Sequence, residues 1–272
     1  MREITDVEEI QGVLLETLDY FKSFCQKNNL KYFLSNGTLL GAVKYNQFIP
    51  WDDDVDIMMP REDYDKLLSL SEIDNGTYKL MSTKTVLQWR MPYSKLSDMR
   101  TVLKEGEFDF GAEFGISVDI FPIDNWSDNK YIARAQALYC EILKRLLISS
   151  NDKCFSTPKK GVKKLILYAI YVTGKALGHK RIYRMITRRA EKSLSSKGKN
   201  VGCVVWTCHG SNGVLPADVF AQQKFMRFCN SEYPIPSGYE KYLDKLYGEW
   251  RKELPPDKQK SNHNIKVWWK DE

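Results

Sequence analysis

Apolar residues near the start of the chain recur every three or four positions, which is the spacing of one face of an α-helix. The residues on this face are Ile10, Val13, Leu14, Leu18, Phe21 and Cys25. Thr5 and Glu8 fit a capping box, in which two side chains satisfy the free N–H groups of the first helical turn. We therefore predict a helix that begins after Thr5 and ends near Asn28–Asn29.

Short apolar runs bounded by turn residues predict strands. They occupy residues 31–35, 55–59, 78–82, 92–97, 115–121 and 201–207. Further helices are expected at 38–45, 60–70, 127–148 (capped by Ser127) and 239–247, with one or two more within 155–200. Strands gathered in the first half, with helices between and after them, predict an α+β or α/β fold.

The segment SNGTLLGAVKYNQFIPWDDDVDIMMP, residues 35–60, combines two features of a phosphate site. Asn36-Gly37-Thr38 lies where a strand leads into a helix, and a helix N-terminus presents N–H groups to an anion. Asp54 and Asp56 follow, and alternation along a strand points both carboxylates to the same side. Their neighbours are apolar, so the strand is expected to be buried and the two acids to need a cation. Oxygen ligands in this arrangement suit Mg²⁺ or Mn²⁺.

A third carboxylate, Asp119, stands alone in the apolar run 115–121. An acid there is costly unless it is paired, hydrogen-bonded or bound to metal, and both a structural and a catalytic role remain open for it. Together with the helix N-terminus and the acid pair, it describes a site for transfer onto or off a phosphate. In such a site the third acid completes the metal shell or deprotonates an attacking hydroxyl.

These motifs resemble the signature of the LicD family of phosphotransferases. The resemblance rests on GTLLGAVKYNQFIPWDDDVDI (residues 37–57) and continues in MPYSKLSDMRTVL (91–103), GISVDIFPID (115–124) and YPIPSGYEKYLDKLYGEWRKELPP (233–256). These segments follow the family's order and span most of the chain.

The resemblance implies an α+β fold with a core sheet like that of polymerase-beta-type nucleotidyltransferases, flanking helices and a basic helical insertion. It assigns the 36–38 turn to phosphate binding, and Asp54, Asp56 and Asp119 to catalysis as metal ligands. Thr38 replaces the usual Ser of the turn and keeps its hydroxyl. Phe228-Cys229 stands where the family often has Phe-Glu.

The resemblance also implies the reaction. A CDP-alcohol, CDP-choline first among them, donates its phospho-alcohol to a hydroxyl of a cell-surface glycan such as lipopolysaccharide or teichoic acid, or of its lipid-linked precursor, and CMP leaves. Ribitol, glycerol and ethanolamine phosphates stay open as alternatives to phosphocholine.

Supporting residues follow from the neighbourhood of the motifs. Lys44 and Lys95 are the better candidates for contacting the diphosphate, while Arg90 and Arg100 also lie near. A quaternary ammonium would need aromatic partners, and those that flank the motifs are Trp51, Trp89, Tyr93 and Trp126. The spacing of Cys203, Cys208 and His209 lacks the pairs of a zinc site.

The 272 residues carry a net charge of +6, with 43% hydrophobic and 28% charged residues, which excludes a disordered chain and an integral membrane bundle. Phe155–Asn200 holds thirteen Lys or Arg and one acid, so this segment has a net charge of +12 and the rest of the chain −6. Two interpretations stay open: a solvated helix pair packed on the core, or peripheral contact of residues 159–192 with an anionic membrane where a lipid-linked acceptor would lie. No nucleic-acid-binding motif accompanies the charge, so no nucleic-acid partner is expected.

Six cysteines without paired spacing indicate reduced thiols. No apolar leader or membrane-spanning run is found, so we expect a cytoplasmic protein, with the inner face of the plasma membrane as the peripheral alternative. The expected organisation is a catalytic core at 1–150, a basic helical insertion at 151–200, and a C-terminal part at 201–272 that completes the same domain.

Two other functions compete with this interpretation. A glycosyltransferase also holds a nucleotide-sugar with Asp-x-Asp, but such folds place that motif after several strands and helices, whereas here it follows about one strand. A non-catalytic nucleotide-binding module is the third candidate, and the presence of all three carboxylates speaks against it.

Overall fold

The computed structural model describes residues 1–106, 108–152, 155, 157–194, 198–207, 209–261 and 264–270. The helices are α1 (Val7–Asn28), α2 (Asn36–Tyr45), α3 (Arg61–Leu67), α4 (Lys130–Asn151), α5 (Gly161–Leu177), α6 (His179–Leu194) and α7 (Tyr239–Tyr247), with 3₁₀ turns η1 (Ser71–Ile73), η2 (Gly210–Gly213), η3 (Ala217–Phe220) and η4 (Pro256–Lys258). The strands are β1 (Arg2–Ile4), β2 (Phe33–Leu34), β3 (Val55–Pro60), β4 (Tyr78–Met81), β5 (Ser94–Asp98), β6 (Thr101–Glu105), β7 (Ser117–Trp126), β8 (Asn200–Gly202), β9 (Leu215–Pro216), β10 (Gln223–Phe228), β11 (Ser231–Pro236) and β12 (Ile265–Trp269).

A mixed sheet forms the centre of the molecule. Its main path runs β2-β3-β7-β5-β4, and β8 extends it from the far end of β7 and pairs with β9. β3 and β7 are parallel, whereas the other neighbours on this path are antiparallel. The fold is therefore α+β with a mixed sheet and flanking helices.

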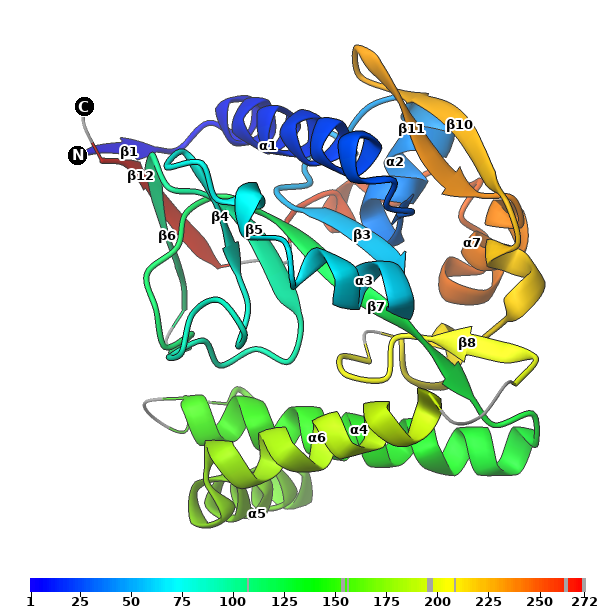
Figure 1. Ribbon diagram of the computed structural model, residues 1–272. Helices are drawn as coiled ribbons and strands as arrows, with labels where there is room; N and C mark the ends of the chain where they lie inside the picture. Colours follow the sequence, from blue (N-terminus) through cyan, green and yellow to red (C-terminus); the bar gives the residue numbers. More distant parts are fainter. Residues whose placement is uncertain are drawn as a thin grey trace.

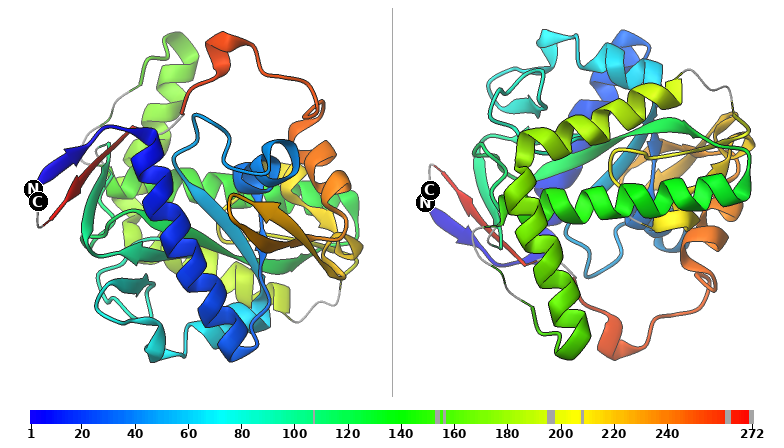
Figure 2. Two further views of the ribbon diagram at one scale, coloured as in Figure 1. Left: turned by 90° about the horizontal axis from the view of Figure 1, so that it is seen from above. Right: turned by 90° about the horizontal axis from the view of Figure 1, so that it is seen from below.

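Helices cover both faces of this sheet (Figure 1). The long helix α1 crosses one face, and α4, α5 and α6 form a layer on the other, with α5 at its outer edge (Figures 1 and 2). α4 packs against both α5 and α6, and α6 also packs directly against β7, so the basic segment is joined to the body through α4 and α6. Among the described residues, no helix combines the length and the apolar run that crossing a membrane requires.

The first helix ends where the sequence predicts, with Asn29 in the left-handed conformation and its N–H bonded to the carbonyls of Cys25 and Gln26. Its start is one residue later than predicted, because Asp6 and not Thr5 is the N-cap and accepts from the Glu8 N–H. Likewise Asn129, not Ser127, caps α4.

Several predicted strand and helix boundaries were wrong. The helix expected at 60–70 is the shorter α3, preceded by Pro60 as the last residue of β3. The 115–121 strand starts later and continues to Trp126, and the 201–207 strand is only β8. Asn36 and Gly37 form the first turn of α2 instead of a separate turn before it.

The expectation that strands gather in the first half was also wrong. β12 pairs with β1 on one side and β6 on the other, which brings the two ends of the chain together, as Figure 1 shows. β10 and β11 form a hairpin that packs beside β2 and α2. The last third of the chain therefore returns to the N-terminal motif and builds part of its surroundings.

Candidate active site

A cleft of about 580 Å³ opens beside the acidic motif. Three parts of the chain line it: the loop and helix around α2 and β3, the strands β5 and β7, and the C-terminal third. The residues from the first two parts include Asn36, Gly37, Lys44, Trp51, Asp54, Asp56, Lys95 and Asp119. All site residues expected from the sequence except Thr38 therefore line one cleft.

The strand register explains how these residues meet. Asp56 on β3 is the direct partner of Asp119 on β7, and Asp119 is the direct partner of Lys95 on β5. Register partners project from the same face of a sheet, so Lys95, Asp119 and Asp56 form a row across three neighbouring strands. About sixty residues lie between Asp56 and Asp119 in the sequence, and the pairing of β3 with β7 brings the two side chains next to each other.

Lys95 is the cation of this row. It is 7% exposed, and its ammonium forms an ion pair with Asp119 Oδ1. Burial acts to lower the Lys95 pKa, but the charge of Asp119 and the hydrogen bond to it outweigh burial and raise the pKa. Lys95 is therefore protonated and places a positive charge beside the Asp119 carboxyl group.

Asp56 lacks such compensation. Burial raises the pKa of its carboxyl well above the ordinary value, and the negative charges of Asp54, Asp119 and Asp52 raise it further. The hydrogen bond from Asn36 Nδ2 to Asp56 Oδ2, at 3.0 Å, opposes this. Asp56 therefore lies in a part of the site where neighbouring carboxylates favour its protonated form.

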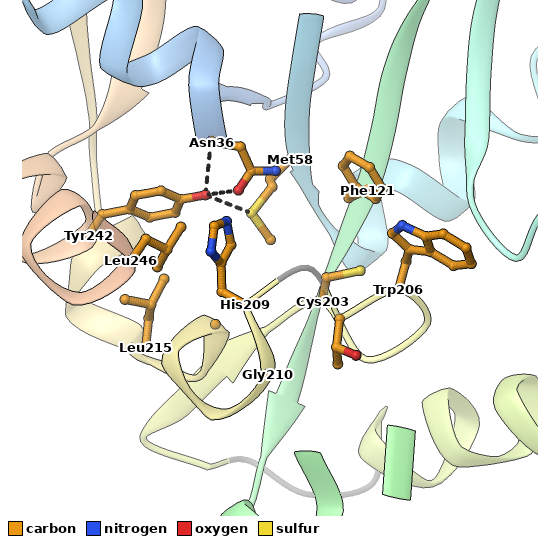
Figure 3. A pocket seen from close by; sticks show the side chains of 12 residues that line it. Asn36, Met58, Phe121, Cys203, Trp206, His209, Gly210, Leu215, Tyr242 and Leu246 are labelled. Atoms are coloured by element: carbon orange, nitrogen blue, oxygen red, sulfur yellow. Dashed lines mark hydrogen bonds between the residues drawn. The ribbon is translucent and has the colours of Figure 1, made fainter. Parts of the chain in front are cut away.

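The first residue of α2, Asn36, is held in an unusual conformation. Asn36 has φ +45°, in the left-handed region that residues other than glycine rarely adopt. The Tyr242 hydroxyl on α7 accepts from the Asn36 N–H at 3.1 Å and donates to Asn36 Oδ1 at 3.0 Å (Figure 3). Because Asn36 Oδ1 accepts from Tyr242, the amide NH₂ of Asn36 points to Asp56. A residue of α7, near the C-terminus, thus orients Asp56 through Asn36.

Two residues of the predicted phosphate turn have other contacts. Thr38 is 2% exposed, and its hydroxyl accepts from the Asp56 backbone N–H at 2.8 Å, so it anchors β3 and does not line the cleft. At Gly37, a Cβ atom would lie 2.8 Å from Asp52 Oδ2. Glycine there makes room for a carboxylate of the protein itself.

The other charged candidates lie apart from the acids. Lys44 lines the cleft rim, where it donates to the Lys252 carbonyl and pairs with Glu253 at 3.1 Å. Arg90 pairs with Asp109, and Arg100 with Asp98, and neither arginine lines the cleft. The buried Asp124, which the GISVDIFPID motif contains, bonds Arg61 and the Val204 N–H and links β7 to its surroundings.

The four aromatic candidates divide into two pairs. Trp51 and Tyr93 line the cleft. Trp89 and Trp126 are buried elsewhere, with the Trp89 indole N–H bonded to the Tyr93 carbonyl. Sequence reasoning missed the aromatic wall that the C-terminal third adds, which consists of Trp206, Tyr247 and Trp250. Its members look like ordinary core residues in the sequence.

A small cavity of about 30 Å³ adjoins the cleft, lined by Trp206, His209, Tyr242 and other residues (Figure 3). Burial lowers the His209 pKa, with Lys144 adding to the effect, so the imidazole is neutral at pH 7. Of the residues weighed for zinc, Cys208 lies outside the described residues, as do Cys154 and His263 elsewhere in the chain.

The carboxylates that line the cleft are the candidate ligands of a divalent cation. In the described ranges, no group of three or more His, Cys, Asp or Glu side chains is arranged to hold a metal ion, and Asp119 is paired with Lys95. Mg²⁺, however, is commonly held by one or two carboxylates together with substrate phosphates and water. Asp54 and Asp56, whose carboxylates both line the cleft, fit that arrangement.

Comparison with known proteins matches the chain to one family model and to several relatives. Residues 29–141 match the family model described as LicD/FKTN/FKRP, nucleotidyltransferase domain. Over 271 residues the chain is 26% identical to the lipopolysaccharide cholinephosphotransferase LicD of Haemophilus influenzae, covering 97% of this chain and 98% of that protein. A 37-residue stretch is 57% identical to uncharacterised proteins of Rickettsia prowazekii and Rickettsia typhi, covering 14% of this chain.

A nucleotidyltransferase-like domain around a carboxylate cleft, with end-to-end similarity to a phosphotransferase, defines the class: this chain is an enzyme of the phosphotransferase type. The part of the chain that matches the LicD family model is residues 29–141, which agrees with the resemblance predicted from the motifs.

Proposed function

We propose that this enzyme transfers phosphocholine from CDP-choline to a hydroxyl of a lipopolysaccharide or a similar cell-surface glycan, with release of CMP. The observation that carries the proposal is the row of Lys95, Asp119 and Asp56 along one wall of a cleft large enough for a nucleotide diphosphate. Similarity over nearly the whole chain to a lipopolysaccharide cholinephosphotransferase supports the choice of alcohol and acceptor.

The proposed reaction is a single displacement at phosphorus. The acceptor oxygen forms a bond to the phosphorus that carries choline, the bond from that phosphorus to the bridging oxygen breaks, and CMP leaves with the bridging oxygen. Lys95 occupies Asp119 Oδ1, so Oδ2 is the oxygen proposed to accept the proton of the attacking hydroxyl. The contact with Lys95 fixes the position of Asp119 and leaves Oδ2 for the acceptor hydroxyl.

Asp54 and Asp56 are the proposed holders of Mg²⁺ or Mn²⁺, with Asn36 orienting Asp56 through Oδ2. A divalent cation there would neutralise the charge of the diphosphate and of the leaving CMP. Trp51 and Tyr93 on the cleft wall are candidates to contact the cytosine or the quaternary ammonium.

We also infer that the path β2-β3-β7-β5-β4 is the counterpart of the polymerase-beta-type core, because Asp56 and the third acid, Asp119, stand on parallel neighbours, β3 and β7, and Asp54 directly precedes β3. The proposed compartment is the cytoplasm, in keeping with the reduced cysteines Cys25, Cys140 and Cys229.

The test uses a panel of donors. The purified chain is incubated with Mg²⁺, lipopolysaccharide and CDP-choline, CDP-ethanolamine, CDP-glycerol or CDP-ribitol, and both CMP release and label in the glycan are measured. We expect acceptor-dependent release from CDP-choline, and a loss of about 10²–10³-fold in kcat for Asp54→Asn, the scale for removing one electrostatic stabiliser of the transition state.

The matched control is Asp218→Asn, which removes an exposed carboxylate outside the cleft and should turn over like the parent. Transfer of sugar from a nucleotide-sugar in place of phosphocholine, or parent-like turnover by Asp54→Asn, would reject the proposal.

A further inference from the structure

Two helices carry a concentration of exposed apolar side chains. Among the described residues, fifteen large apolar side chains are exposed, and ten of them lie on α4 and α5. Those on α5 are Val162, Leu165, Ile166, Tyr168 and Val172, and those on α4 are Tyr131, Ile132, Leu138, Tyr139 and Ile142. A cluster of this kind on a folded protein marks an interaction surface.

The apolar side of α5 points away from the body. Its inner side is fixed by Gly174, where a Cβ atom would lie only 2.7 Å from the Leu146 carbonyl of α4. Val162, Leu165 and Ile166 lie at helical spacing on the outer side, and Val162 and Leu165 are 74% and 68% exposed. α5 is also the outermost helix of its layer in Figure 1. We call these ten side chains of α4 and α5 the apolar face.

The surroundings of the apolar face are strongly basic. Lys159, Lys160, Lys163 and Lys164 are all exposed and stand at the start of α5. The next helix, α6, buries Ile182 and Ile186 and exposes a series of Lys and Arg. The segment 155–200 thus has a net charge of +12, while the rest of the chain has −6.

We propose that the apolar face and the basic residues around it dock the enzyme on the surface of an anionic lipid bilayer. Apolar side chains enter the headgroup boundary, tyrosines such as Tyr131, Tyr139 and Tyr168 suit that depth, and lysines attract anionic headgroups. A second copy of the chain fits poorly, because docking face to face would bring two segments of +12 together.

The orientation suits a lipid-linked acceptor. In both views of Figure 2, α5 and the segment around η4 project toward the same edge of the molecule, although Figure 1 places them at different heights. Lys258 and Lys260 of that segment line the cleft. A bilayer on the side of the molecule toward which α5 projects would thus lie on the same side as Lys258 and Lys260.

The proposal is tested by vesicle binding of the full chain, which does not depend on transfer activity. Sedimentation is measured with neutral phosphatidylcholine vesicles and with vesicles that contain phosphatidylglycerol, at low and high salt. We expect binding to the anionic vesicles alone and its loss in high salt. Lys163→Gln with Lys164→Gln should weaken binding by about 30-fold, at about 1 kcal/mol for each lysine.

Two further variants separate the contributions. Leu165→Ser with Ile166→Ser should also weaken binding, whereas Leu87→Ser removes a 92% exposed apolar side chain outside the apolar face and should not. Lys27→Gln with Lys31→Gln is the charge-matched control at the exposed end of α1 and should bind like the parent. Circular dichroism confirms that each variant is folded.

Three outcomes would overturn the proposal. They are absence of binding at low salt, equal binding to neutral vesicles, and loss of binding to the same extent in the Lys27/Lys31 control. Self-association of the chain that Leu165→Ser with Ile166→Ser abolishes, without vesicle binding, would assign the face to contact between copies instead.

Discussion

Removal of the Lys95 ammonium tests the electrostatic balance of the site. Lys95→Met keeps the length and apolar stem of the side chain but leaves Asp119 beside Asp56 without a cation. Loss of one partner of a buried ion pair costs about 3–5 kcal/mol, because the other charge remains buried and uncompensated. At about 2 °C per kcal/mol for a chain of this size, we expect the midpoint of thermal unfolding to fall by about 6–10 °C.

The measurement is denaturant and thermal unfolding in metal-free buffer, with Lys79→Met on the neighbouring strand β4 as control. Asp119→Asn should relieve most of the cost when it is added to Lys95→Met, so the double variant should be more stable than the sum of the single changes predicts. A free energy of unfolding for Lys95→Met within about 0.5 kcal/mol of the parent, or strict additivity in the double variant, would refute the reasoning.

Three further predictions concern the frame of the site. Tyr242→Phe removes both hydrogen bonds to Asn36, so the free energy of unfolding should fall by about 1–3 kcal/mol. Calorimetry should also show weaker Mn²⁺ binding, and unchanged binding would contradict the role of Tyr242 in positioning Asn36. Gly41→Ala should destabilise the folded protein by about 1–3 kcal/mol, because the added Cβ would lie 2.6 Å from a backbone carbonyl oxygen of the following loop. At Gly12 on α1 an added Cβ meets nothing within 4 Å, so Gly12→Ala should stabilise the protein slightly. Because the Asp56 pKa is raised, the folded state binds the carboxyl proton of Asp56 more tightly than the unfolded chain does, so the free energy of unfolding should fall as pH rises above about 4. When unfolding is measured against pH in metal-free buffer, Asp56→Asn should lack this part of the fall. The same pH dependence in Asp56→Asn and the parent would contradict the prediction.

The sequence predicted the elements whose signals are local. α1 and α7 follow from helical spacing, and the strand that carries Asp56 follows from an apolar run directly after the acids. The apolar run around Asp119 also predicted that its carboxylate would be paired, hydrogen-bonded or bound to metal, and in the structure it pairs with Lys95.

Other elements depend on pairing between distant segments. β1 and β6 are too short to be recognised alone, and both become strands because β12 pairs with them from the other end of the chain. The caps at Asp6 and Asn129 were missed because Thr5 and Ser127 nearby have equal capping chemistry, and only the backbone path selects between them.

The same limit applies to the site. Tyr242 lies 206 positions from Asn36, and no local sequence pattern predicts that its hydroxyl orients the side-chain amide of Asn36. Thr38 matches the family turn, yet the fold uses its hydroxyl for the backbone of β3. A motif gives the type of residue present, whereas the tertiary contacts decide which atom remains for the substrate.

Anomalous diffraction from crystals grown with Mn²⁺ and CDP-choline tests the central claim most directly. The account predicts a strong anomalous peak about 2 Å from carboxylate oxygens of Asp54 and Asp56, with diphosphate oxygens completing the coordination. A bound donor with the manganese peak elsewhere, or with no manganese beside these two acids, would contradict it.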